Sequence, residues 1–110
     1  GPYDAIFCMA VLQRKPHEIA NKGIRSLKHI YPFEKFEEQI QQLDQLLHQD
    51  GLMVIHFSQY VLTDTCVAVG YRPLGDPMQS NAVTPLFDRQ SQRIETPRQV
   101  NSIFLKMNER

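Results

Sequence analysis

The chain has 110 residues, of which 42% are hydrophobic, 9% aromatic and 22% charged, values typical of one globular domain. Twelve Lys and Arg residues balance twelve Asp and Glu residues, so the formal net charge is zero. A protein that tracks phosphates needs a basic surplus or stripe, so this balance argues against general nucleic-acid binding. No apolar run approaches the roughly 20 residues of a membrane span, so we expect a soluble protein without a membrane segment.

The two cysteines indicate the redox setting. Cys8 and Cys66 each lie in an apolar stretch with no second cysteine two to four residues away, which argues against a zinc knuckle or a disulfide framework. We therefore expect reduced thiols and a cytoplasmic protein. The chain opens with Gly1-Pro2, which is typical of the remnant of a tag-removing protease. We expect residues 3–110 to be a single α/β domain, or half of one, from a longer protein.

The first half of the chain predicts a strand, a crossover with helices, and a second strand. Residues 5–12 are a continuous apolar run, typical of a strand buried on both faces of a mainly parallel sheet. Residues 17–30 are predicted to be helical. In residues 33–48 the apolar residues recur at spacings of three and four, which predicts an amphipathic helix starting after Pro32. Residues 52–57 then form a second buried strand, which completes a βαβ unit.

The second half has weaker patterns. Residues 61–71 are predicted to form a short helix capped by Thr63 or Asp64. Residues 72–81 contain two prolines and a glycine and are predicted to be a loop. Residues 82–88 and 101–107 alternate or cluster apolar residues, and we expect two terminal strands that pair antiparallel.

Ligands of open α/β sheets bind beyond the carboxyl ends of the strands, so the residues that follow each strand are the candidate site. Residues 56–60 offer an imidazole, a hydroxyl, an amide and a phenol within five positions. Some of these side chains could instead satisfy local backbone groups. The four histidines do not fall at the spacings of metal-ligand pairs, so we expect no metal site. Cys8 is flanked by Phe7 and Met9, which favours core packing over nucleophilic catalysis.

Three stretches carry a resemblance to a known family. Residues 3–8 read Tyr-Asp-Ala-Ile-Phe-Cys, residues 36–47 form an amphipathic helix ending in Leu-Leu, and residues 48–55 read His-Gln-Asp-Gly-Leu-Met-Val-Ile. In this order they resemble the second half of a class I S-adenosylmethionine-dependent methyltransferase, a Rossmann-like fold. The family's proline-glycine-glycine turn is replaced here by Gln49-Asp50-Gly51.

The resemblance implies a fold and a site. It implies about four strands in the family's spatial order of fourth, fifth, seventh and sixth, mostly parallel, with flanking helices and a C-terminal antiparallel hairpin. It also implies that residues after the fourth and fifth strands line the reacting methyl group and the substrate. These candidates are Met9, Ala10, Leu12, Gln13, His56, Ser58, Gln59 and Tyr60, and no catalytic base is identified among them.

The family's cofactor-binding glycine-rich turn follows its first strand, and this chain resembles the family only from the fourth strand onward. We therefore expect S-adenosylmethionine to bind the intact parent protein but not this chain alone. The leading function is the C-terminal, substrate-side part of a methyltransferase, inactive in isolation. The alternative is a non-catalytic α/β interaction or dimerisation module with a degenerate methyltransferase-like fold. The expected partner is a second copy, paired through the edge strand of residues 5–12, or the missing N-terminal half.

Overall fold

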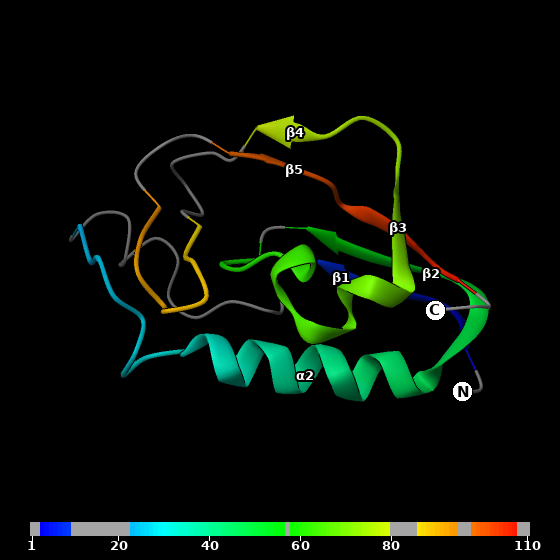
Figure 1. Cartoon of the computed structure of the whole chain (residues 1–110), viewed down its shortest axis with the longest axis horizontal. Helices are drawn as coiled ribbons and strands as arrows, with labels where there is room; N and C mark the ends of the chain where they lie inside the picture. The colour runs from blue at the N-terminus through cyan, green and yellow to red at the C-terminus, as the bar shows by residue number, and fades with distance from the viewer. Residues whose placement is uncertain (1–2, 10–22, 57, 80–85, 95–97, 108–110) are drawn as a thin grey trace.

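The computed structural model describes residues 3–9, 23–56, 58–79, 86–94 and 98–107. The first elements are strand β1 (Tyr3–Met9), helix α2 (Phe33–Leu46) and strand β2 (Leu47–His56). Two short 3-10 helices follow, η1 (Leu62–Asp64) and η2 (Cys66–Gly70). Strands β3 (Tyr71–Leu74), β4 (Met78–Gln79), β5 (Gln99–Val100) and β6 (Ile103–Lys106) complete this part of the chain (Figure 1).

Four strands form one mixed sheet in the order β1-β2-β6-β3. β1 and β2 run parallel, whereas β6 runs antiparallel to both of its neighbours, β2 and β3. Three strands therefore share one direction and β6 is reversed. A separate antiparallel pair joins β4 to β5. With α2 between the two parallel strands, the protein belongs to the α/β class, as predicted.

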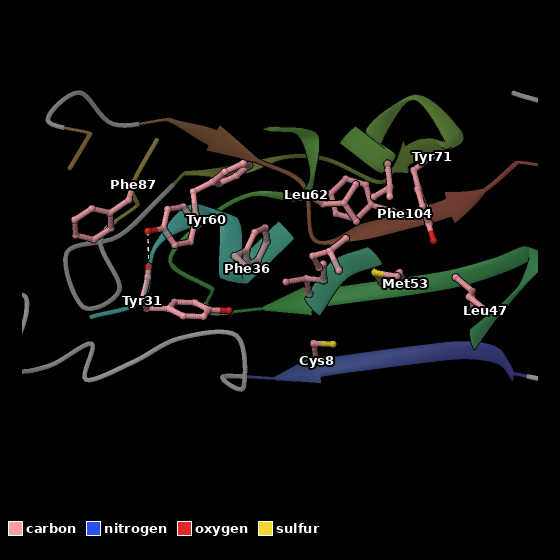
Figure 2. Packing of buried hydrophobic residues seen from close by; sticks show 14 of the residues in the cluster. Cys8, Tyr31, Phe36, Leu47, Met53, Tyr60, Leu62, Tyr71, Phe87 and Phe104 are labelled. Atoms are coloured by element: carbon pink, nitrogen blue, oxygen red, sulfur yellow. Dashed lines mark hydrogen bonds between the residues drawn. The ribbon is translucent and has the colours of Figure 1, made fainter. Parts of the chain in front are cut away.

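Helix α2 covers one face of the sheet. Phe36 and Ile40 of α2 pack in one cluster with Cys8 of β1 and with Met53 and Ile55 of β2. Because successive side chains of a strand point to opposite faces, this register places Cys8, Met53 and Ile55 on the covered face. Figure 2 shows the resulting core between α2 and the strands.

The predicted helix of residues 33–48 is confirmed, with its end two residues earlier, at Leu46. Pro32 is its N-cap residue, which accords with a proline's fixed φ at a helix start. The buried stripe of α2 continues from Phe36 and Ile40 to Asp44, while Leu46 is exposed. The sequence pattern missed this polar member of the stripe, because apolar periodicity counts only apolar residues.

Asp44 is buried because it binds two groups from the strands β6 and β3. The Lys106 ammonium of β6 lies 3.3 Å from Asp44 Oδ1 and donates to the Asp44 and Leu47 carbonyl oxygens at 2.6 and 2.9 Å. The Tyr71 hydroxyl of β3 donates to Asp44 Oδ1 at 2.7 Å. Lys106 thus places a cation at the C-terminus of α2, where the carbonyl groups of a helix need donors and the macrodipole favours positive charge.

The expectation that the first strand is buried on both faces is wrong for the part described. Ala5 and Phe7 are exposed on the face that α2 does not cover. The continuous apolar run suggested two covering layers, but the one α-helix among the described residues supplies a single layer. Residues 10–12 of the predicted strand lie outside the described part.

Three other predictions need correction. The helix of residues 17–30 is absent from its described part, 23–30, where Gly23 has a φ of +63° and Ser26 forms a bridge with Gln92. The helix of residues 61–71 is present as η1 and η2, separated by Thr65 in an extended conformation. The terminal strand β6 was expected to pair with residues 82–88, but on that side it pairs with β3, most of which was predicted to be a loop. Of residues 82–88, Leu86 to Asp88 are described, and they form only a bridge at Phe87.

Position 51, within β2, requires glycine. Asp50, the preceding residue, has a φ of +65°. The ladder between β1 and β2 is irregular here, because β2 contains more residues than β1 between the pairs Tyr3–Leu47 and Ala5–Leu52. A Cβ at Gly51 would lie 2.7 Å from Leu47 Cδ1, 2.8 Å from the His48 oxygen and 2.9 Å from the Asp4 oxygen. The backbones of the two strands therefore approach too closely for any side chain at this position.

Gly51→Ala is expected to lower the free energy of unfolding by about 2–3 kcal/mol, because the new methyl group overlaps two backbone oxygens. Gly75→Ala is the matched comparison, since Gly75 has a φ of +75° but open space around its Cβ position. Its conformational strain should cost only about 1–2 kcal/mol. Urea unfolding followed by circular dichroism measures both, and an equal or smaller loss for Gly51→Ala would contradict the proposed overlap.

Asp44→Ala is expected to lower the free energy of unfolding by about 3–5 kcal/mol, because it leaves the buried Lys106 ammonium without its carboxylate. Tyr71→Phe removes one hydrogen bond to the same carboxylate and should cost about 1 kcal/mol. The same urea titration compares the two variants. Equal losses would mean that the ion pair adds nothing beyond an ordinary hydrogen bond.

Candidate functional site

The carboxyl ends of β1 and β2 lie level with each other. Met9, the last residue of β1, pairs with His56, the last residue of β2. Ser58 follows β2, and both His56 and Ser58 are half-buried, so their side chains reach the surface. Three of the predicted site residues, Met9, His56 and Ser58, therefore lie at the edge where α/β sheets bind ligands. Ala10, Leu12 and Gln13 lie outside the described residues.

Gln59 and Tyr60 are placed in the interior instead. Both side chains are fully buried, and the Gln59 carbonyl oxygen accepts a hydrogen bond of 2.8 Å from the Phe87 N–H. The Ser58 hydroxyl donates to the Tyr60 carbonyl oxygen at 2.6 Å. The chain therefore turns inward after Ser58, and residues 59–60 anchor this turn rather than facing an open cleft.

Tyr60 is the centre of an aromatic cluster. Its ring lies 5.4–6.2 Å, between centroids, from those of Tyr31, Phe33, Phe36 and Phe87. Its hydroxyl donates to the Tyr31 carbonyl oxygen at 2.6 Å, as Figure 2 shows. Tilted and edge-on ring pairs of this kind are favourable, and the buried hydroxyl has a partner. The cluster joins the start of α2 to the segment before α2, through Tyr31, and to the segment after β2, through Tyr60.

Burial raises the pKa of Tyr60 to about 12. This pKa already includes the lowering effect of a hydrogen bond with the Ser91 hydroxyl and the smaller raising effects of the negative charges of Glu34 and Asp88. Tyr60 is therefore a neutral phenol at ordinary pH and has no role as a base there.

An open depression of about 370 Å³ lies between the start of α2 and the segment after β2. It is lined by Phe33, Glu34, Glu37, Asp64, Thr65, Cys66 and Arg89. α2 begins on the side toward which the arrowhead of β2 points, so the depression is on the carboxyl-end side of the sheet (Figure 1). Its lining residues Asp64, Thr65 and Cys66 follow the predicted site residues 58–60 in the chain, and no predicted site residue lines it.

Two of its carboxylates are already engaged. Glu37 Oε2 accepts from the Cys66 N–H at 2.9 Å. Asp64 binds the Arg98 guanidinium in a bidentate pair at 3.0 and 3.1 Å, and this hydrogen bonding with Asp64 raises the pKa of Arg98. No sequence pattern pointed to these residues, because they converge only when η1 and η2 fold against α2.

Cysteine and metal chemistry receive no support from the described residues. Cys8 is in the core, as predicted, and burial raises the pKa of its thiol, which disfavours the reactive thiolate. Within the described ranges no group of three His, Cys, Asp or Glu side chains could hold a metal ion. Among the described residues, the candidate site consists of the polar side chains of His56 and Ser58 at the end of β2 and of the charged depression.

The alkaline pH dependence of stability tests the burial of Tyr60. Its pKa is raised in the folded state, so the stabilisation is complete below about pH 10 and is lost as the pH rises toward 12. We expect the free energy of unfolding to fall over this window and to fall less steeply in Tyr60→Phe. Urea titrations at several alkaline pH values measure both slopes, and identical slopes would show that Tyr60 ionises as easily folded as unfolded.

The chain was compared with known proteins by sequence and by fold. No protein-family model, curated protein or solved structure matches it. Among the described residues, no helix has the length and apolar character needed to cross a membrane.

Proposed function

We propose that this chain is the C-terminal, substrate-side part of a class I S-adenosylmethionine-dependent methyltransferase. The observation that carries the proposal is the sheet order β1-β2-β6-β3 with only β6 reversed. The resemblance implied the family's fourth, fifth, seventh and sixth strands in this spatial order, with an antiparallel hairpin at the end. Under this proposal β3 would correspond to the sixth strand of the family and β6 to the seventh.

The level ends of β1 and β2 support the location of the site. His56 and Ser58 would border the reacting methyl group and the substrate, with Met9, Ala10, Leu12 and Gln13 following the neighbouring strand. Methyl transfer requires an acceptor atom held in line with the sulfonium, and correct positioning can supply much of the rate. The proposal therefore assigns these residues to positioning and names no catalytic base.

The charged depression fits the substrate side of such a site. It lies next to the start of α2, and its exposed Glu34 and Arg89 carry charges of opposite sign. Polar groups of this kind orient a bound molecule while the apolar wall, here Phe33, contributes contact area. The free thiols of Cys8 and Cys66 accord with the reducing cytoplasm that we propose for the protein.

The chain alone is expected to show no saturable binding of S-adenosylmethionine at micromolar concentration in a calorimetric titration. The physical reason is that the glycine-rich turn implied by the family is not in this sequence, so the cofactor lacks its main backbone contacts. The encoded sequence upstream of Tyr3 should contain a strand and a G-x-G-type turn roughly 50–70 residues earlier. The chain extended by that segment should bind the cofactor.

Tight binding to the isolated chain would contradict this assignment of the chain to the substrate-side half. A natural start codon near Tyr3 would instead favour the alternative, a non-catalytic α/β interaction module. That alternative is supported by the exposure of the apolar strand β1 at the edge of the sheet.

A further inference from the structure

The exposed apolar side chains on the open face of the sheet are concentrated on β1. Val54, in the central strand β2, is 8% exposed, and Ile103 of its neighbour β6 is 37% exposed. Phe7 of β1, which pairs with Val54, is 69% exposed, and Tyr3 of β1 is 53% exposed. The apolar surface open to a partner therefore lies along the edge strand β1 rather than over the centre of the sheet.

β1 is also an edge strand without the usual protection. No other described strand pairs with its outer side. Natural edges are blunted by lysine, proline, bulges or short length, whereas Tyr3–Met9 spans seven residues with Asp4 as its one charge. Its outward backbone groups and its exposed aromatic side chains therefore form one surface suited to another strand.

We propose that this surface binds a second copy of the chain, with the two β1 strands paired antiparallel around a two-fold axis at Ala5. In this register Ala5 faces Ala5 of the other copy, and each Tyr3 faces a Phe7. Tyr3 and Phe7 are large and Ala5 between them is small. The antiparallel pairing therefore places the exposed Tyr3 ring of each copy beside the exposed Phe7 ring of the other. The sheets of the two copies join into one.

Two features favour a second copy over a different partner strand. The contact is isologous, so each surface group finds its complement in the same surface of an identical chain. The formal net charge is zero, so two copies meet without overall repulsion. The proposal does not rest on the methyltransferase assignment, and oligomeric state is measured independently of cofactor binding.

Light scattering and sedimentation equilibrium on the wild-type chain should give twice 12.8 kDa at micromolar concentration. Phe7→Glu should weaken dimerisation about a hundredfold, because it buries a carboxylate at the seam twice in each dimer. The matched control is Val69→Glu, since Val69 is an apolar residue, 71% exposed, on η2 beside α2. It should remain a dimer. Circular dichroism should show native helix and strand signals for both variants, whose sites are on the surface.

A charge-pair rescue tests the register. Tyr3→Lys alone should also weaken the dimer, whereas Tyr3→Lys combined with Phe7→Glu should restore it, because each lysine then faces a glutamate of the other copy. Within one chain the two positions are four residues apart on an extended strand, roughly 13 Å, too far to pair internally. The rescue therefore requires contact between copies.

Three outcomes would overturn the proposal. The first is a wild-type chain that stays monomeric at high micromolar concentration. A monomer whose β1 pairs only with the upstream segment counts as the same outcome. The second is a dimer that Phe7→Glu and Tyr3→Lys leave intact, which would locate the contact elsewhere. The third is a double variant that stays monomeric, which would exclude the register around Ala5. If Phe7→Glu fails to fold, Tyr3→Lys and its rescue decide.

Discussion

The buried ammonium group of Lys106 connects the end of α2 to the strands. It binds the Asp44 carboxylate and two carbonyl oxygens at the point where α2 ends and β2 begins, and Tyr71 of β3 donates to the same carboxylate. The junction of α2 and β2 therefore meets the distant strands β6 and β3 at this one charge pair. A buried ion pair is costly to form and more costly to break on one side, so it specifies a single arrangement of helix on sheet. The α2 end cannot slide along the sheet without losing both partners.

The aromatic cluster around Tyr60 plays the corresponding part at the other end of α2. Tyr60, in the segment after β2, donates its hydroxyl to the segment before α2 and packs its ring on the first turns of α2. The charge pair therefore holds the end of the helix, and the cluster holds its start. Between them lies the apolar face of Phe36 and Ile40 on the strands. The candidate site lies beside the aromatic end, where the chain leaves β2 at His56.

Local patterns predicted the elements whose signals are local. The βαβ unit followed from an apolar run, an amphipathic repeat and the turn at Gly51, each within about sixteen residues. Burial depends on long-range packing, which explains why the burial of Asp44 was not predicted and why Tyr60 was expected at the ligand-binding edge. Asp44 is buried with Lys106, and Tyr60 is buried by rings from four other positions. β3 was predicted to be a loop because Pro73 and Gly75 suggest one, yet Pro73 is tolerated in a strand at the sheet edge. At the site, the strand-end residues were predictable from topology, whereas the charged depression arises only from η1 and η2 folding onto α2.

The two free thiols differ in burial, so the rates of their chemical modification report local opening of the structure. Cys66 is exposed on η2, whereas Cys8 lies under α2 with its reactivity suppressed by burial. A thiol reagent will modify Cys66 directly but can reach Cys8 only when β1 separates from the core. The rate at Cys8 therefore measures the free energy of that separation, without an introduced label. Comparing it with the free energy of global unfolding shows whether the edge strand detaches alone or only with the whole sheet.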